Sequence, residues 1–343
     1  MTDGLDIENV DALTGYLRER GAIPGDESPG LQTLRGGVSN RTVRVDLCNG
    51  SSWVLKQALS KLRVEVDWFS DPRRVHREAA GIRWLSSTLP EGAVPGLVFE
   101  DHERHIIAME AVPLPHEIWK TVLLRGDVDG DAVRQLAVIL ATMHGESCRR
   151  RDAVPGELED RSYFESLRLE PCYGFAAAKL PRARSFLTGV IEETRARRES
   201  VVHGDFSPKN VLVHGGRLVL IDHEVIHVGD PSFDLGFSLT HMLSKAHHVD
   251  GRRQAFNAAA RLYWETYRES LGDVDFAADL ETRVVRQTLA CLLARVAGRS
   301  PLEYLDDAER ECQQEAILSL MPCPPRTVPG LISAFVAALP GDG

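Results

Sequence analysis

The sequence predicts an α+β fold in which a small β-rich lobe precedes a larger α-rich lobe. Short alternating apolar segments with turn signals fill the first third of the chain, and long helical patterns follow Pro113. The length of 343 residues is too great for one small core and suits two lobes. We therefore predict an N-terminal lobe over residues 1–110 and a C-terminal lobe over residues 111–343.

The first half of the N-terminal lobe is predicted to be a short helix followed by three strands. The helix covers residues 6–21, and the strands cover residues 31–34, 42–47 and 53–57. Asn49-Gly50, between the second and third strands, is a strong hairpin signal. The second and third strands are therefore expected to pair as an antiparallel hairpin.

The main helix of this lobe is predicted to begin at Asp71-Pro72. Asp71 suits the N-cap, and Pro72 suits the first helical position. The apolar positions that follow have helical spacing: Val75, Ala79, Ile82 and Leu85. Two further strands are predicted over residues 97–100 and 105–109.

The C-terminal lobe carries three long helical patterns, over residues 131–144, 255–271 and 275–296. A β-like block over residues 201–220 lies between the first and second of them. Nearby, Asp127, Asp129 and Asp131 have the first three ligand spacings of a calcium loop, but Ala132 stands where the loop requires glycine. Helix capping by Asp129 or Asp131 is the preferred interpretation.

Composition excludes several classes of protein. The formal net charge of −10 opposes nucleic-acid binding, and no stretch of about 18 apolar residues suggests a membrane span. The acidic N-terminus lacks the basic start of a secretory signal, and the six cysteines are scattered without a Cys-x-x-Cys pair. We expect a cytoplasmic protein with free thiols, no disulfide framework and no cysteine zinc site; the oligomeric state stays open.

The strongest chemical signal is the segment Val202-His203-Gly204-Asp205-Phe206-Ser207-Pro208-Lys209-Asn210-Val211. It places an acid and an amide five residues apart in a loop between apolar segments. Asp205 is able to take a proton from an attacking hydroxyl, and the Asn210 amide oxygen is able to ligate a hard cation. Lys209 could reach a phosphate or simply be solvated, and the sequence leaves both open.

A second acid follows an apolar strand. Leu218-Val219-Leu220-Ile221 ends in Asp222, twelve residues after Asn210. Two oxygen ligands together with substrate phosphates suit Mg²⁺, which keeps several waters. We therefore expect Asn210 and Asp222 to share one magnesium ion.

The N-terminal lobe offers groups for a nucleotide. Gly36 and Gly37 lie between two strands, where backbone amides come close to phosphates, and Ser39 and Asn40 follow them. Lys56 lies on the returning strand and could reach the α- and β-phosphates of ATP. Its natural partner is Glu78, which falls on the apolar helix stripe, where an unpaired carboxylate is costly.

The His203-Gly204-Asp205 and Ile221-Asp222 blocks, followed by Gly229-Asp230-Pro231 and Asp234, resemble the aminoglycoside phosphotransferase and choline-kinase-type superfamily. Supporting residues in the N-terminal lobe are Gly36 to Asn40, Leu55 to Leu59 and Arg63-Val64. The match covers roughly residues 30 to 305. Within the superfamily the chain most resembles the methylthioribose-kinase-like branch. The resemblance implies a protein-kinase-like two-lobe fold.

The resemblance also implies roles for residues. Asp205 would be the catalytic base, and Asn210 and Asp222 the magnesium ligands. Glu110 and Val112 would lie in the hinge, whose backbone holds the adenine. Asp230 and Asp234 would buttress the catalytic loop, and His203 is expected to orient this loop rather than carry a proton.

The sequence contains fewer signals for the acceptor site. Arg295 and Arg299 are candidates, although arginines at a helix end are commonly surface residues. Trp119 could form a lid or belong to the core, and the core is preferred.

The predicted activity is ATP- and Mg²⁺-dependent phosphorylation of a hydroxyl on a small molecule. A methylthioribose-like or other pentose-type sugar is the first acceptor class, and an aminoglycoside or other antibiotic is the alternative. A non-catalytic nucleotide-binding protein on a kinase fold is the alternative of another class. A protein kinase is a further rival, but the chain lacks the His-Arg-Asp and Ala-Pro-Glu motifs.

Overall fold

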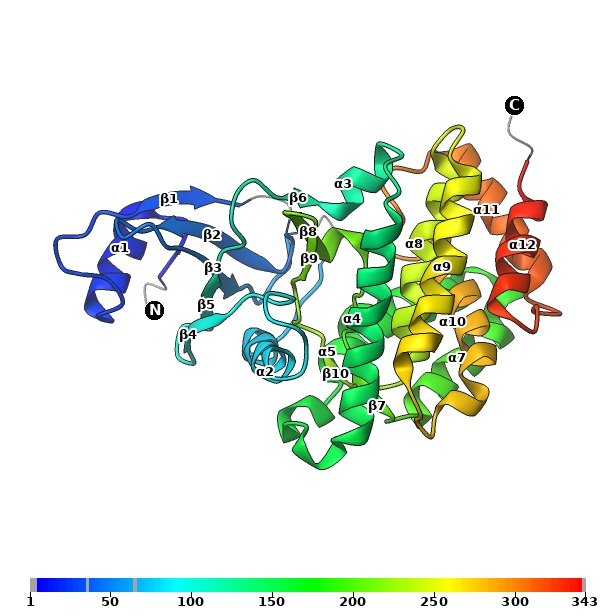
Figure 1. Ribbon diagram of the computed structural model, residues 1–343, viewed down its shortest axis with the longest axis horizontal. Helices are drawn as coiled ribbons and strands as arrows, with labels where there is room; N and C mark the ends of the chain where they lie inside the picture. The colour runs from blue at the N-terminus through cyan, green and yellow to red at the C-terminus, as the bar shows by residue number, and fades with distance from the viewer. Residues whose placement is uncertain (1–4, 35–36, 64–66, 341–343) are drawn as a thin grey trace.

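The computed structural model describes residues 5–34, 37–63 and 67–340. It has the predicted α+β architecture, with a small sheet region at the N-terminal end of the molecule and a larger helical region beyond it (Figure 1). Gly36 and Val64, which support the sequence prediction, lie outside the described residues.

The N-terminal sheet is antiparallel and has the strand order β1-β2-β3-β5-β4. The predicted hairpin joins the second and third of these strands, with Gly50 at a φ of +87° in its turn. Glycine tolerates this left-handed conformation at little cost. The strands are β1 (Gly30–Thr33), β2 (Asn40–Asp46), β3 (Ser52–Ala58), β4 (Leu97–Asp101) and β5 (Ile106–Glu110).

Two helices cover the two faces of this sheet. Helix α1 (Val10–Glu19) packs against Val45 and Leu55, and helix α2 (Arg74–Ser86) packs against Ile107 on the other face. Because side chains alternate along a strand, Lys56 points to the α2 face whereas Leu55 points to α1. This alternation directs the lysine toward the helix that carries its predicted partner.

Helix α2 begins two residues later than predicted. Arg73 is its N-cap, and it makes no side-chain capping bond. The Asp71 carboxylate instead accepts a hydrogen bond from the Arg73 amide at 2.9 Å. Asp71 therefore stabilises the turn before the helix rather than the first helical turn, because short acidic side chains readily bond the backbone two residues on.

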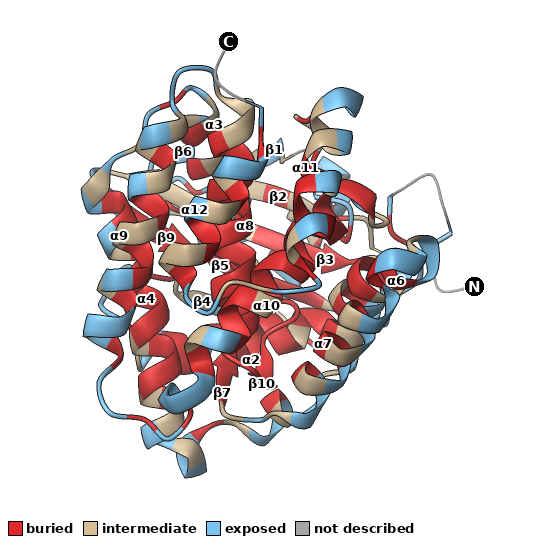
Figure 2. Cartoon of the chain, turned by 90° about the vertical axis from the view of Figure 1, so that its right-hand side faces the viewer, coloured by how far each residue is buried: buried red, intermediate tan, exposed pale blue. Residues whose placement is uncertain are grey.

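The helical region is built around helix α8 (Ser232–His248), which contacts α9 (Arg253–Leu271) and α10 (Ala277–Ala297). Figure 2 shows buried residues along α8 and most of α10, and exposed residues along the outer helices. The sequence prediction missed α8, because a helix that is buried on every side lacks the 3.6-residue apolar period. The remaining longer helices are α3 (Trp119–Leu124), α4 (Gly130–Arg149), α7 (Arg184–Ala196), α11 (Asp307–Leu320) and α12 (Val328–Ala338). Between α4 and α7 lie the helical turns η1 (Arg151–Ala153) and η2 (Gly156–Glu159), α5 (Ser162–Phe164), the π-helix η3 (Glu165–Gly174), α6 (Phe175–Lys179) and η4 (Pro181–Ala183).

The helices α4, α9 and α10 correspond to the three predicted patterns. Asp129 caps α4 by accepting a hydrogen bond from the Asp131 amide at 2.9 Å, so the capping interpretation is confirmed. Trp119 is 1% exposed and belongs to the core, as preferred. No helix in the described ranges is long and apolar enough to cross a membrane.

The β-like block is also present and forms two small sheets. One pairs β7 (Ser200–Val202) with β10 (His227–Gly229), and the other has the order β6-β8-β9. The second sheet comprises β6 (Glu117–Ile118), β8 (Val211–His214) and β9 (Arg217–Leu220). The loop between β7 and β8, which contains the 3₁₀ turn η5 (Pro208–Asn210), and the segment after β9 carry the predicted chemical groups.

Candidate active site

The loop that carries Asp205 is held by Asp234 at the start of α8. The Asp234 carboxylate accepts hydrogen bonds from the backbone amides of His203 at 2.7 Å and Gly204 at 2.9 Å. Gly204 has a φ of +77°, and a Cβ there would lie 3.1 Å from the Val225 carbonyl oxygen. The loop therefore adopts a glycine-dependent turn, and the predicted buttressing by Asp234 is confirmed.

Asp230 does not buttress the loop, so that part of the prediction is wrong. Its carboxylate accepts hydrogen bonds from the Ser232 amide and hydroxyl, at 3.0 and 2.7 Å, and pairs with Arg283. Asp230 therefore fixes the beginning of α8 against α10, because its side chain reaches the helix start rather than the loop.

The Asp205 carboxylate is fully buried, and its two oxygens differ in their hydrogen bonding. All of its ion-pair and hydrogen-bond partners meet Oδ2: Arg168 at 2.7 Å, Lys209 at 3.0 Å and the Asn210 amide nitrogen at 3.0 Å. Oδ1 is buried without a hydrogen-bond partner among the described residues. One oxygen is thus held in place while the other is left for a reacting group.

Electrostatics keep this carboxyl ionised. Burial alone would raise the pKa of Asp205, but the cations of Arg168 and Lys209 together hold it below its usual range. Lys209, one of the open cases, is half-exposed and pairs with Asp205 rather than being simply solvated.

Arg168 is a site residue that sequence reasoning missed. It lies on the π-helical segment η3 (Glu165–Gly174), and its side chain is 13% exposed. It lies 37 residues before Asp205, a separation that no sequence motif of the site includes. The two residues meet only through the packing of the helical region.

The predicted ion pair between Lys56 and Glu78 is present. Lys56 Nζ lies 2.7 Å from Glu78 Oε1 and 2.8 Å from Asp222 Oδ1. Burial would lower the pKa of Lys56, but the two carboxylates raise it, so the side chain remains an ammonium. Burial raises the pKa of Glu78, and the ammonium opposes that shift.

Asp222 follows β9 in a left-handed conformation, with a φ of +69°. Burial would raise the pKa of its carboxyl, but Lys56 and Lys209 lower it, so it is ionised. The backbone amide of Ile221 donates to the Asn210 carbonyl oxygen at 2.9 Å, which ties the two predicted metal-binding segments together.

The residues present suit a magnesium ion. Asn210 uses its amide nitrogen as a donor to Asp205 at 3.0 Å, so its amide oxygen remains available as an acceptor. Asp222 adds a carboxylate, and two oxygen donors match the preference of Mg²⁺ for a few protein ligands alongside phosphates and water.

His203 has the expected orienting contacts. Its Nδ1 accepts a hydrogen bond from the Asp205 amide at 3.2 Å, and its Nε2 lies 3.3 Å from the Ile221 carbonyl oxygen. Burial lowers the pKa of this ring, so it is neutral and bridges the loop to the segment before Asp222.

The glycine-rich segment meets the helical region through a buried cluster. Arg74, which is 0% exposed, lies 3.1 Å from the Glu224 carboxylate, and the Asn40 amide donates to the same oxygen at 3.3 Å. Arg74 also donates to the Ser39 carbonyl oxygen. Sequence reasoning missed the pairing of Arg74 with Glu224. Ser39 and Asn40 are therefore linked to Glu224, two residues after Asp222, whereas Gly36 lies outside the described residues.

Two backbone amides of the predicted hinge already donate hydrogen bonds within the protein. The Glu110 amide donates to the Gly96 carbonyl oxygen and the Ala111 amide to the Ser52 carbonyl oxygen, each at 2.8 Å. Among the described hinge residues, Val112 is therefore the one whose backbone amide donates no hydrogen bond to a backbone carbonyl oxygen.

The two acceptor candidates lie in different surroundings. Arg295 is 9% exposed, stacks over Phe237 at 4.8 Å and helps to lower the pKa of Asp205. Arg299 is half-buried, lies over Trp68 at 4.8 Å and donates to the Asp67 carbonyl oxygen. Of the two, only Arg295 is buried, and it is the one that acts on the Asp205 carboxyl.

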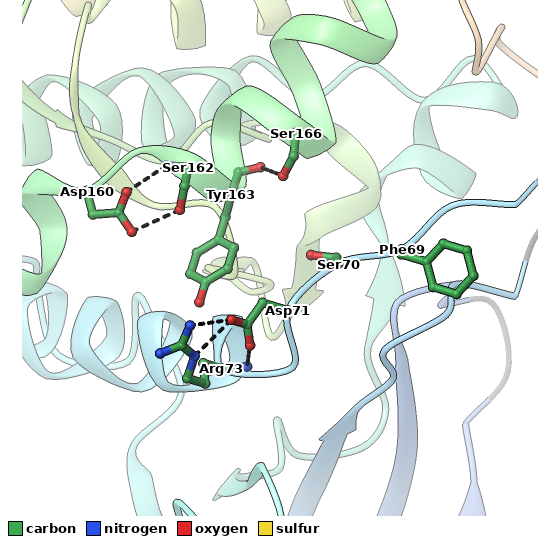
Figure 3. Close-up of a pocket in the computed structure, with 8 residues that line it drawn as sticks. All are labelled: Phe69, Ser70, Asp71, Arg73, Asp160, Ser162, Tyr163 and Ser166. Carbon is green, nitrogen blue, oxygen red and sulfur yellow. Dashed lines mark hydrogen bonds and ion pairs between the residues drawn. The ribbon is translucent and has the colours of Figure 1, made fainter.

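A separate groove of about 470 Å³ lies between the start of α2 and the α5 segment (Figure 3). Asp71 and Arg73 pair on one side of it, and Asp160 accepts hydrogen bonds from Ser162 on the other. The residues that line it do not include Asp205, Asn210 or Asp222, so the groove is distinct from the candidate active site.

The fold and the site together define a phosphotransferase of the protein-kinase-like class. The sequence matches the model of the Phosphotransferase enzyme family over residues 30–271. The chain belongs to that family.

Curated relatives include methylthioribose kinases. That of Yersinia enterocolitica is 25% identical over 309 residues, covering 79% of this chain and 74% of the relative. That of Pectobacterium atrosepticum is 23% identical over 294 residues, covering 75% and 73%. The predicted resemblance is therefore confirmed.

Solved structures confirm the fold class. An amicoumacin kinase in complex with AMP-PNP and Ca²⁺ superposes with a TM-score of 0.59 at 14% identity, covering 91% of this chain and 94% of its own. Macrolide 2'-phosphotransferase MphH from Brachybacterium faecium gives 0.53 at 19% identity, with coverage of 92% and 99%.

Proposed function

We propose that the protein transfers the γ-phosphate of ATP to a hydroxyl of a small molecule, with Asp205 accepting the hydroxyl proton. The observation that carries the proposal is the asymmetric Asp205 carboxylate. Three donors hold Oδ2, and the buried Oδ1 has no hydrogen-bond partner in the described part of the chain. A base needs an ionised, fixed oxygen within reach of the proton that it removes.

The nucleotide would bind between the sheet region and the helical region. We assign residues 1–110 to nucleotide binding and residues 111–343 to catalysis and acceptor binding. Lys56, held by Glu78 at 2.7 Å, would meet the phosphates, and the Val112 amide would meet the adenine. Gly36, Gly37, Ser39 and Asn40 would cover the phosphates, with Glu110 at the edge of the hinge.

Asn210 and Asp222 would hold magnesium. When bound, the ion would neutralise negative charge on the phosphates. The protein's own contribution is to keep both Asp222 and Asp205 ionised beside Lys56, Arg168 and Lys209.

For the acceptor, a methylthioribose-like or other pentose-type sugar is the first class to test, because both curated relatives named above are methylthioribose kinases. The alternative acceptor class is an aminoglycoside or other antibiotic.

The test is ADP release from Mg·ATP across a panel of pentoses, methylthioribose, aminoglycosides and choline. An acceptor that stimulates turnover in the wild type but not in Asp205→Ala supports the proposal and identifies the acceptor class. Binding of Mg·ATP without turnover on any acceptor would favour the non-catalytic alternative.

A further inference from the structure

A cluster of imidazole and carboxylate groups lies on the sheet region, away from the Asp205 loop. His76, Glu100 and His102 each place a ligand atom within 4.8 Å of the others. They come from three places in the chain: α2, β4 and the turn between β4 and β5. Helix α2 lies beside β4 (Figure 1), so the cluster spans the contact between a helix and the sheet edge.

A third histidine adjoins the cluster. His105 Nδ1 lies 3.3 Å from His76 Nε2, and the rings of His76 and His102 stack with centroids 4.0 Å apart. His105 takes a left-handed backbone conformation, with a φ of +50°. His105 therefore adjoins the group of His76, Glu100 and His102 through its contact with His76.

The hydrogen bonding within the cluster is incomplete. His76 Nδ1 is buried and has no hydrogen-bond partner among the described residues. His76 Nε2 faces His105 Nδ1, so a proton on Nε2 would be donated to that nitrogen and Nδ1 would keep a free lone pair. An unmet buried nitrogen in the group formed with Glu100 and His102 is an independent observation that points to a ligand.

The donor set selects the class of metal. Imidazole nitrogens with one carboxylate oxygen suit Zn²⁺ and other late first-row divalent ions, whereas Mg²⁺ and Ca²⁺ prefer oxygen donors. Zinc–nitrogen bonds of about 2.1 Å place tetrahedral donors about 3.4 Å apart. The ligand atoms of His76, Glu100 and His102 lie within 4.8 Å of one another, and rotation of the exposed His102 side chain would bring them to this spacing.

We propose that His76, Glu100 and His102 form a zinc site that joins α2 to the turn between β4 and β5, with His105 holding the second ring nitrogen of His76. Glu100 Oε2 pairs with Arg83 at 2.8 Å, and Oε1 contacts His102 Nε2, so a bound ion would replace the direct contact between this oxygen and the ring. His76 lies two residues before Glu78 in α2, so a bound ion would fix the helix that carries the partner of Lys56. The site is distinct from the oxygen ligands assigned to magnesium.

The experiment is titration of chelator-treated full-length protein with Zn²⁺ by calorimetry, in millimolar Mg²⁺ so that the oxygen site is occupied. The wild type is expected to bind one equivalent. His102→Ala and His76→Gln are expected to weaken binding about 100-fold or more. His214→Ala, which alters a histidine on β8 outside the cluster, serves as the matched control and should bind as the wild type does.

A second readout tests the donor set independently of activity. Co²⁺-loaded wild type should show the intense visible absorption of a tetrahedral site, and His102→Ala should lose it. Zn²⁺ should raise the thermal midpoint of the wild type and of His214→Ala, but not of the two cluster variants. Absence of Zn²⁺ binding by the wild type, or equal binding by His102→Ala, would overturn the proposal.

Discussion

Lys56 Nζ lies 2.8 Å from Asp222 Oδ1, so one ammonium joins strand β3 of the sheet region to the segment that follows β9 in the helical region. The same ammonium lies 2.7 Å from Glu78 on α2. The three groups come from β3, α2 and the segment after β9. A displacement of α2 would therefore separate Glu78 from Lys56 and change the net charge at the candidate nucleotide site.

Removing the ammonium should reduce the stability of the protein as well as its activity. Lys56→Met leaves the fully buried Glu78 carboxylate without a counter-charge, and we expect a loss of about 3 kcal/mol in the free energy of unfolding. Urea denaturation at pH 7 measures it. Adding Glu78→Gln to Lys56→Met should recover part of this stability, because the buried charge is then gone. A double variant as unstable as the sum of both singles would contradict the ion-pair account.

Asp205→Ala should reduce turnover by several orders of magnitude while Mg·ATP still binds, because phosphoryl transfer depends on positioning and charge. The measurement combines ADP release with nucleotide titration. Near-normal turnover in this variant would remove Asp205 from the role of base.

Asp222→Ala should instead mainly weaken Mg·ATP binding, as measured by nucleotide titration in the presence of Mg²⁺. Unchanged affinity would exclude Asp222 as a metal ligand.

Arg168 should set the pH range of catalysis. Arg168 and Lys209 lower the pKa of Asp205, so the wild-type base stays ionised in mildly acidic solution. In Arg168→Met the pKa of Asp205 should rise, and the acidic limb of the kcat/KM profile should move to higher pH. Arg182→Met, which removes an exposed arginine paired with Glu315, is the matched control. Identical acidic limbs in the two variants would indicate that Arg168 only supports the fold.

Lys245 should make stability depend on alkaline pH. Burial lowers its pKa to about 7, so between pH 7 and its ordinary value the unfolded chain binds more protons than the folded one. The free energy of unfolding should therefore rise with pH across this window, by at most about 5 kcal/mol. Lys245→Met should remove this rise and stabilise the protein at pH 7, as measured by denaturation at several pH values. Lys179→Met, at an exposed lysine on α6, should leave the rise intact.

The local elements of the sheet region were predictable because each has its own pattern. Alternating Val43 and Val45, the Asn49-Gly50 turn and the stripe of α2 all identify elements through short-range spacing. Boundaries moved: α2 begins two residues later than predicted, and α1, which Asn9 caps, begins four residues later. The buried helix α8 was not predictable, because complete burial removes the periodic contrast between polar and apolar faces.

The two carboxylates, the amide and the lysine of the candidate site could be identified from the amino-acid sequence, because their spacing around apolar strands is typical of a phosphotransferase site. The Lys56–Glu78 pair was predictable too, since a carboxylate on an apolar stripe demands a partner. The contacts of Arg168 with Asp205, Arg74 with Glu224 and Asp230 with Arg283 became visible only in the folded protein. These contacts join residues 37 to 150 positions apart, and pairing at such separation depends on how the elements pack rather than on any local pattern.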